Sequence, residues 1–166
     1  MTEPGLRPTP DRVRETLFNW LAPVIEGARC LDLFAGTGAL CLEALSRGAA
    51  EVVMVERAAH VAEQLRHNLA TLKADGAAVI QTDAGEFLRR PPQHFDIIFL
   101  DPPFASSLIE SCAAAIARGG WLAPGGLVYV EAPASMQPLP VPSVWELAKS
   151  KRAGQVGYHL LRAPAP

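Results

Sequence analysis

The residues best suited to chemistry are Asp101, Pro102, Pro103 and Phe104, which follow an apolar run. Two adjacent prolines cannot continue a hydrogen-bonded ladder, so they stiffen a loop whose carbonyls point outward. The Asp101 carboxylate and a proline carbonyl can accept both hydrogens of an exocyclic NH2, while Phe104 stacks on the ring that carries it. This alignment turns the nitrogen lone pair toward an electrophile. We therefore predict a site that activates an aromatic amino group; the alternative is a proline-terminated strand with a chance phenylalanine.

A glycine-rich turn follows another apolar run. Asp32 leads into Phe34-Ala35-Gly36-Thr37-Gly38, after which a helical pattern begins. Glycines let the backbone approach a ligand closely, and the helix start presents free N–H groups. The position that would complete a dinucleotide fingerprint is Cys41, and a Walker lysine is lacking. The turn therefore favours a nucleoside without a pyrophosphate, although an ordinary strand-to-helix turn would read the same way.

Two more carboxylates follow the next two apolar runs. Glu56 comes 20 residues after Gly36, where an acid can accept hydrogen bonds from both ribose hydroxyls of an adenosine. A glutamate that begins a surface helix is the alternative, but its place at a strand end favours the ligand role. Asp83 can accept from an adenine amino group or cap the short helix that follows, and the local sequence does not separate the two.

These residues need elements that bring strand ends together, and the hydrophobic pattern provides them. Apolar runs at 30–34, 52–55, 78–80, 95–100 and 126–130 alternate with helical patterns at 39–47, 58–73 and 107–118, and with a short helix near 87. Such strands between helices are typical of a parallel sheet covered on both faces. Runs at 144–150 and 156–162, joined by 151–154, predict an antiparallel hairpin. In helix 58–73, Val61, Leu65, Leu69 and Leu72 form the expected apolar stripe.

The predicted fold is therefore a single α/β domain over residues 1–166, with a doubly wound, Rossmann-like, mostly parallel seven-stranded sheet. Residues 1–9 are expected to form a loop. Thr9 then caps a helix that has Pro10 at its first position and Asp11 in its first turn. Its apolar face carries Val13 and Leu17, and Pro23 ends it.

Composition excludes several classes of protein. Hydrophobic residues make up 49% of the 166 residues and charged residues 19%, unlike a disordered chain. The net charge of −2 gives no bulk reason to bind nucleic acid. No apolar run is long enough to span a membrane, and the start does not resemble a secretory signal. Three widely spaced cysteines and four scattered histidines suggest neither a disulfide framework nor a metal site, so we expect a cytoplasmic protein without metal.

Together, Asp32–Gly38, Glu56, Asp83 and Asp101–Phe104 resemble the class I S-adenosylmethionine-dependent methyltransferases that act on amino groups. Leu6-Arg7-Pro8-Thr9 followed by 11–21 is similar to the opening of the bacterial 16S rRNA guanine-N2 methyltransferase family. The segments 40–45, 68–73 and 153–156 resemble it as well, and the likeness extends from Leu6 to Leu161. The opening block separates this family from DNA adenine methyltransferases with the same Asp-Pro-Pro loop.

The resemblance implies a class I methyltransferase fold, S-adenosylmethionine as methyl donor, and methyl transfer to N2 of a guanine rotated into the pocket. Asp32 and the turn would hold the methionine end of the cofactor, Glu56 its ribose and Asp83 its adenine. The implied cofactor set is Asp32, Phe34, Ala35, Gly36, Thr37, Gly38, Glu56, Arg57, Asp83 and Ala84. The implied catalytic set is Asp101, Pro102, Pro103 and Phe104, in which Asp101 and Pro102 align N2 and Phe104 stacks on the base.

The implied partner is 16S rRNA within a small-subunit assembly particle, bound by a monomer. Candidate RNA contacts are Arg7, Arg12 and Arg14 by resemblance, and Lys151 and Arg152 in a segment, 145–166, that carries a charge of +3. Residues 15–144 carry −6, so cationic ends flank an acidic body. The family's basic segment before the Arg-Pro-Thr block is expected to be absent, because the chain begins almost at that block.

Three alternatives stay open from the sequence. The first is an amino methyltransferase with another target, such as DNA adenine, another RNA or a protein glutamine. The second is a non-catalytic S-adenosylmethionine-binding module, against which the intact Asp101–Phe104 loop argues. The third is a nicotinamide dehydrogenase, which Cys41 and the lack of an evident catalytic histidine or lysine disfavour.

Overall fold

The computed structural model describes residues 11–103 and 106–164, with residue 106 described by its backbone. Its strands form a seven-stranded sheet in the order β3-β2-β1-β4-β5-β7-β6. The strands are β1 Arg29–Asp32, β2 Glu51–Glu56, β3 Ala77–Gln81, β4 Phe95–Leu100, β5 Leu122–Pro133, β6 Glu146–Ala153 and β7 Val156–Arg162. The helices are α1 Asp11–Leu21, α2 Ala39–Ser46, α3 Ala59–Leu72, α4 Ala84–Phe87 and α5 Ser106–Gly119.

The strand directions confirm the predicted fold class. Strands β3, β2, β1, β4 and β5 pair in parallel, while β7 pairs antiparallel with both β5 and β6. The chain order reverses between β1 and β4, which is the switch point where doubly wound sheets bind ligands. The functional residues are therefore expected at the carboxyl ends of the parallel strands.

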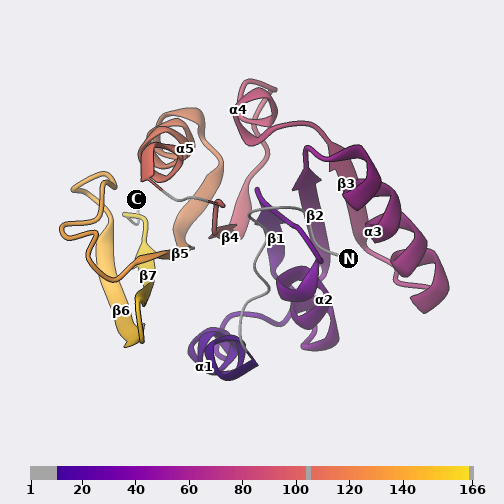
Figure 1. The fold of residues 1–166 in the computed structure, drawn as a ribbon, viewed down its shortest axis with the longest axis horizontal. Helices are drawn as coiled ribbons and strands as arrows, with labels where there is room; N and C mark the ends of the chain where they lie inside the picture. Colours follow the sequence, from indigo (N-terminus) through magenta and orange to yellow (C-terminus); the bar gives the residue numbers. More distant parts are fainter. Residues whose placement is uncertain (1–10, 104–105, 165–166) are drawn as a thin grey trace.

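Helices cover both faces of the sheet (Figure 1). On one face, Leu17 of α1, Cys41 of α2 and Leu65 of α3 share a core with Cys30 of β1. On the other, α4 and α5 pack over alternate strand residues such as Leu31 of β1. Because successive strand residues point to opposite faces, apolar runs without polar alternation are what such a sheet requires.

Most predicted element ends agree with the structure within one or two residues, but three features differ. Lys151 and Arg152, predicted to lie in the connection, belong to β6, and the turn is at Gly154. Exposed charged residues suit this position because β6 is an edge strand. Strand β5 begins four residues before the predicted position. Leu72, predicted on the buried stripe, is 61% exposed at the end of α3.

The start of α1, the cysteines and the lengths of the helices bear on the remaining predictions. Helix α1 is described from Asp11 onward, while the predicted cap Thr9, the predicted first position Pro10 and the predicted 1–9 loop lie outside the described residues. Cys30, Cys41 and Cys112 are buried free thiols. None of the described helices is long and apolar enough to cross a bilayer.

Candidate active site

Four carboxylates lie along one edge of the sheet. Asp32 ends β1, Glu56 ends β2, Asp83 comes two residues after β3, and Asp101 directly follows β4. These four strands are neighbours and run parallel, so their carboxyl ends meet at the same edge. The four residues therefore share one edge of the sheet, as predicted, and their binding of a ligand there stays a prediction.

Asp32 is a buried carboxyl group, 2% exposed. Its Oδ1 accepts a 3.0 Å hydrogen bond from the Phe34 N–H, which closes a local turn after β1. The pKa of Asp32 is raised to about 7. Burial is the main cause, the Phe34 hydrogen bond acts against it, and the nearby Glu56 charge adds to it. A carboxyl group held in this way is suited to a cationic ligand group, which would favour its charged form.

Glu56 is 8% exposed and ties three segments together. Its Oε1 accepts a 3.0 Å hydrogen bond from the Gly36 N–H, and its Oε2 accepts a 2.9 Å bond from the Ala58 N–H. The side chain therefore joins the end of β2 to the turn after β1 and to the start of α3. Each oxygen can accept a second hydrogen bond, so the predicted ribose contact requires no loss of these two.

The turn after β1 depends on two glycines with positive φ, +53° at Gly36 and +80° at Gly38. A Cβ added at Gly38 would lie 2.7 Å from Leu65 Cδ2, so α2 and α3 come together there. The N–H groups of Ala35 and Gly38 donate to the carbonyls of Val55 and Ala35. Backbone donors spent inside the protein are poorly placed to cradle a pyrophosphate, in line with the nucleoside reading of this turn.

Asp83 acts as the N-cap of α4. Its Oδ1 accepts a 2.8 Å hydrogen bond from the Glu86 N–H, and the residue is exposed. Of the two roles that the sequence left open, the structure contains the cap. The adenine contact stays a prediction, as do the roles of the exposed Arg57 and the buried Ala84.

The loop after β4 is partly enclosed. Pro102 is buried, while Asp101 and Pro103 are half-buried; Phe104 lies outside the described residues. Asp101 is close enough to Tyr129 of β5 for its charge to raise the pKa of the phenol, after the larger effects of burial and of Glu131. Tyr129 Oη donates a 2.8 Å hydrogen bond to Glu131 Oε2. This pair was not predicted, although a glutamate inside the apolar segment 127–132 was a visible signal.

The basic residues predicted to contact RNA occupy two places. Arg12 on α1 is exposed, as are Lys151 and Arg152 on β6. Helix α1 packs beside the C-terminal hairpin through Trp20 and Tyr158, whose ring centroids are 5.7 Å apart. Arg7 lies outside the described residues.

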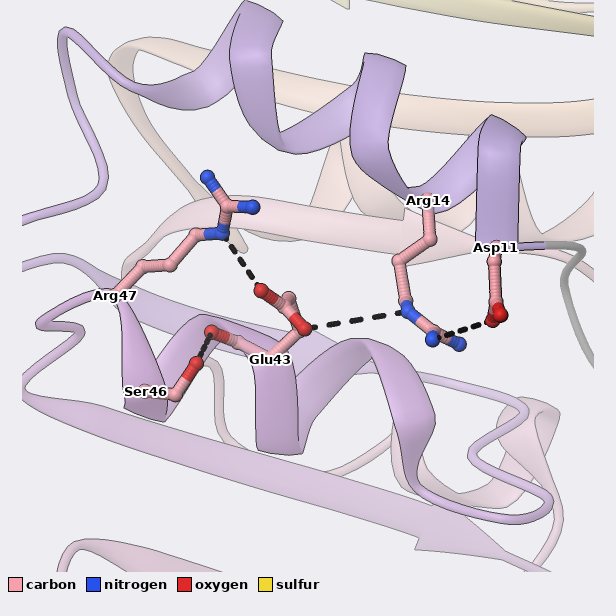
Figure 2. A network of polar contacts seen from close by, with 5 residues as sticks. All are labelled: Asp11, Arg14, Glu43, Ser46 and Arg47. Carbon is pink, nitrogen blue, oxygen red and sulfur yellow. Dashed lines mark hydrogen bonds and ion pairs between the residues drawn. The ribbon is translucent and has the colours of Figure 1, made fainter.

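Arg14 points into a network of ion pairs between α1 and α2 (Figure 2). Its Nη2 lies 2.7 Å from Asp11 Oδ1, and its Nε lies 4.0 Å from Glu43 Oε1. Glu43 also pairs with Arg47 Nε at 2.7 Å. Because two acids and two arginines balance here, Arg14 has a structural role in the folded chain, and an RNA contact by it stays a prediction.

The acceptors at this edge fit S-adenosylmethionine in chemical type. That molecule presents an ammonium group, two ribose hydroxyls and an adenine amino group, all of which donate hydrogen bonds. Asp32, Glu56 and Asp83 present carboxylates in the matching strand order β1-β2-β3. Among the described residues, no group of three or more histidine, cysteine or acidic side chains is arranged to hold a metal.

Comparison with known proteins agrees with this geometry. The model of the family described as Conserved hypothetical protein 95 matches residues 1–162. Ribosomal RNA small subunit methyltransferase D of Escherichia coli K12 is 51% identical over 162 residues, which cover 98% of this chain and 82% of that protein.

Solved structures of methyltransferases superpose on this chain. A putative methyltransferase from Escherichia coli, yhhF, superposes with a TM-score of 0.91 at 52% identity, covering 98% of this chain and 90% of that one. An RNA methyltransferase from Salinibacter ruber, in complex with S-adenosyl-L-homocysteine, has a TM-score of 0.75 at 19% identity over 96% of this chain and 95% of its own. At 19% identity, the similarity to the Salinibacter ruber protein shows a shared fold alone.

Proposed function

The chain belongs to the Conserved hypothetical protein 95 family and to the family of ribosomal RNA small subunit methyltransferase D, and on that premise we propose that it transfers a methyl group from S-adenosylmethionine to the exocyclic N2 of a guanine in 16S rRNA. It is thus an RNA methyltransferase. The observation that carries the proposal is the position of Asp101-Pro102 directly after β4, the strand that pairs with β1. Asp32 ends β1 at the same edge of the sheet, where it pairs with Phe99, two residues before Asp101. This arrangement supports a role for the loop in binding an amine next to an edge that binds the cofactor.

S-adenosylmethionine, when bound, supplies an electrophilic methyl group. Asp32 and the turn 34–38 would hold its methionine end, Glu56 its ribose and Asp83 its adenine. Glu56 accepts a hydrogen bond from Gly36 of this turn, and the Gly38 N–H donates to the Ala35 carbonyl, so this part of the site is organised before ligand binding. Catalysis of this kind depends mainly on positioning.

The target guanine must leave its stack to reach this edge. Asp101 and the Pro102 carbonyl accept the two N2 hydrogens and so orient the nitrogen, and Phe104 stacks on the base. The Asp101 carboxylate is also the acceptor we nominate for the proton that N2 loses. No metal is needed for these steps, because positioned acceptors bring about each of them.

The remaining parts of the proposal concern setting and partners. We place the activity in the cytoplasm, on a small-subunit assembly particle, by a monomer. Arg7, Arg12, Lys151 and Arg152 would approach the phosphates. Support comes from the exposure of Arg12 and the two β6 residues, and from the packing of α1 against β7, the strand that pairs with β6.

The test is a substrate panel with a labelled methyl donor. Unmodified small ribosomal subunits, naked 16S rRNA and duplex DNA are each incubated with the protein, and label is counted in each. We expect label in the rRNA of the subunits. Transfer to DNA alone would identify another amino methyltransferase, and cofactor binding without transfer to any substrate would identify a binding module.

A further inference from the structure

Glu131 is a buried carboxylate that the reaction described above does not use. It is 5% exposed and lies on β5, where the segment 127–132 is otherwise apolar except for Tyr129. Burying a charged carboxylate is costly unless hydrogen bonds compensate for the lost water. Such a residue beside a ligand site is a candidate for function.

The strand register places Glu131 level with Asp101. Strands β4 and β5 run parallel, with Phe99 paired to Tyr129 and Leu100 paired to Val130. The next residue on each strand is therefore Asp101 on one and Glu131 on the other. Alternation along β5 puts Glu131 on the same face as Tyr129, which packs with Phe99 in the core under α1 and α2.

Tyr129 fixes the Glu131 carboxylate. Its Oη donates a buried 2.8 Å hydrogen bond to Oε2. Burial, then the charge of Glu131, raises the pKa of the phenol, and Asp101 raises it further, so Tyr129 stays a donor. Because Glu131 and Asp101 both raise the pKa of Tyr129, both carboxylates lie near its hydroxyl group. A carboxylate has about four acceptor positions, so the bond from Tyr129 does not use up the acceptor capacity of Glu131.

We propose that Glu131 selects guanine at this site by accepting a hydrogen bond from N1–H of the target base, an inference that rests on the proposed function. Guanine carries N1–H next to its N2 amino group, so a base whose N2 is held by Asp101 and Pro102 turns N1–H toward a neighbouring acceptor. Adenine has an unprotonated N1 next to its amino group. Its lone pair would face the Glu131 carboxylate, which rejects it.

The experiment compares guanine with 2,6-diaminopurine at the methylated position of a small-subunit substrate. Diaminopurine keeps the N2 amino group but has a lone pair at N1. In Glu131→Gln, the amide oxygen can still accept from Tyr129, and the amide NH2 can donate to that lone pair. We expect Glu131→Gln to shift the guanine-to-diaminopurine ratio of kcat/KM by at least about tenfold toward diaminopurine. Glu146→Gln, at an exposed residue of β6, is the matched control and should leave the ratio unchanged.

Each result decides the matter. If Glu131→Gln lowers both rates equally, Glu131 is structural and the inference is wrong. If the wild-type protein methylates neither substrate, the proposed function fails instead. S-adenosylhomocysteine binding and thermal melting check that the variant folds. If it does not fold, Tyr129→Phe removes the hydrogen bond that orients the Glu131 carboxylate. We expect this variant to lower the preference for guanine, and an unchanged ratio would overturn the inference.

Discussion

Glu56 at the end of β2 accepts a 3.0 Å hydrogen bond from the N–H of Gly36, in the turn that follows β1. A residue predicted to bind ligand therefore also builds the loop that would contact the same ligand. Removing its charge should disturb both functions together.

Glu56→Gln tests this dual role. An amide has one acceptor oxygen, and its NH2 group would face either the Gly36 or the Ala58 N–H, so one buried bond is lost. We expect the free energy of unfolding to fall by about 1–3 kcal/mol and S-adenosylhomocysteine binding to weaken at least about tenfold. Thermal melting and titration calorimetry measure the two effects. Glu63→Gln, at an exposed residue of α3, is the control; equal melting temperatures for both variants would contradict the dual role.

Asp32 predicts a pH dependence of stability in the ligand-free protein. Its pKa is raised to about 7 in the fold, above the usual 3.8 of an aspartate, so the fold favours the neutral form. The contribution of this group is complete below pH 4 and is lost as pH rises through about 7. Asp32→Asn should remove this loss, so the melting temperatures of the two proteins should diverge as pH rises from about 4 to about 7 and differ by a constant amount above that. Parallel curves from about pH 5 to 8.5 would show that Asp32 is already charged.

The same Asp32 predicts the opposite trend for cofactor binding. A ligand ammonium favours the charged carboxylate, so wild-type affinity for S-adenosylhomocysteine should increase as pH rises through about 7. In Asp32→Asn, affinity should be weaker and lack this rise. Calorimetry at several pH values and matched ionic strength measures the affinity of both proteins. An equal rise in affinity in Asp32→Asn would assign the pH dependence to another group.

His159 predicts a loss of stability on the acid side. The ring is 3% exposed, Nδ1 shares a 2.7 Å hydrogen bond with Ser150 Oγ, and Nε2 has no partner among the described residues. Burial lowers the pKa of His159 below 6.5. Protonation therefore favours the unfolded chain, and this contribution to stability, present above pH 6.5, is lost as pH falls through the lowered value. His159→Gln should reduce the drop in melting temperature between about pH 7.5 and 5, and an unchanged drop would contradict this origin.

Arg12 and Arg14 are predicted to differ in RNA binding, although both are on the same helix. Arg12 is exposed, whereas Arg14 pairs with Asp11 and Glu43 (Figure 2). Arg12→Gln should weaken binding to rRNA and reduce the slope of log K against log salt by about 0.7–0.9. Arg14→Gln should instead lower stability by about 0.5–1 kcal/mol with a smaller change in slope. Filter binding at several salt concentrations measures the slope for each variant. Equal slopes for Arg12→Gln and Arg14→Gln would contradict the prediction that only Arg12 contacts RNA.

The sequence predicted the arrangement of the fold because apolar runs and helix-period stripes repeat along most of the chain. It misplaced Lys151 and Arg152, since charged residues before a glycine read as a turn, yet an edge strand tolerates them. It also shortened β5, where Pro124 and Gly125 read as a loop although residues 122–133 form one strand with a register shift.

Within the site, strand ends predicted where the carboxylates lie but not their partners. Asp83 could cap or bind, and a hydrogen bond to Glu86 N–H was needed to identify the cap. The Tyr129–Glu131 pair depends on alternation within β5, and its position beside Asp101 depends on the register of β5 with β4, which long-range packing sets. Local sequence therefore predicts positions along this edge better than it predicts hydrogen bonds.

The central claim is methyl transfer to N2 of guanine, directed by Asp101. The most direct test is mass analysis of nucleosides from unmodified small subunits after incubation with S-adenosylmethionine and either wild-type protein or Asp101→Ala. We predict N2-methylguanosine with the wild-type protein, and a loss of at least about 100-fold in rate with a variant that still binds S-adenosylhomocysteine. Methylated adenine instead of N2-methylguanosine, or an undiminished rate in Asp101→Ala, would contradict the account.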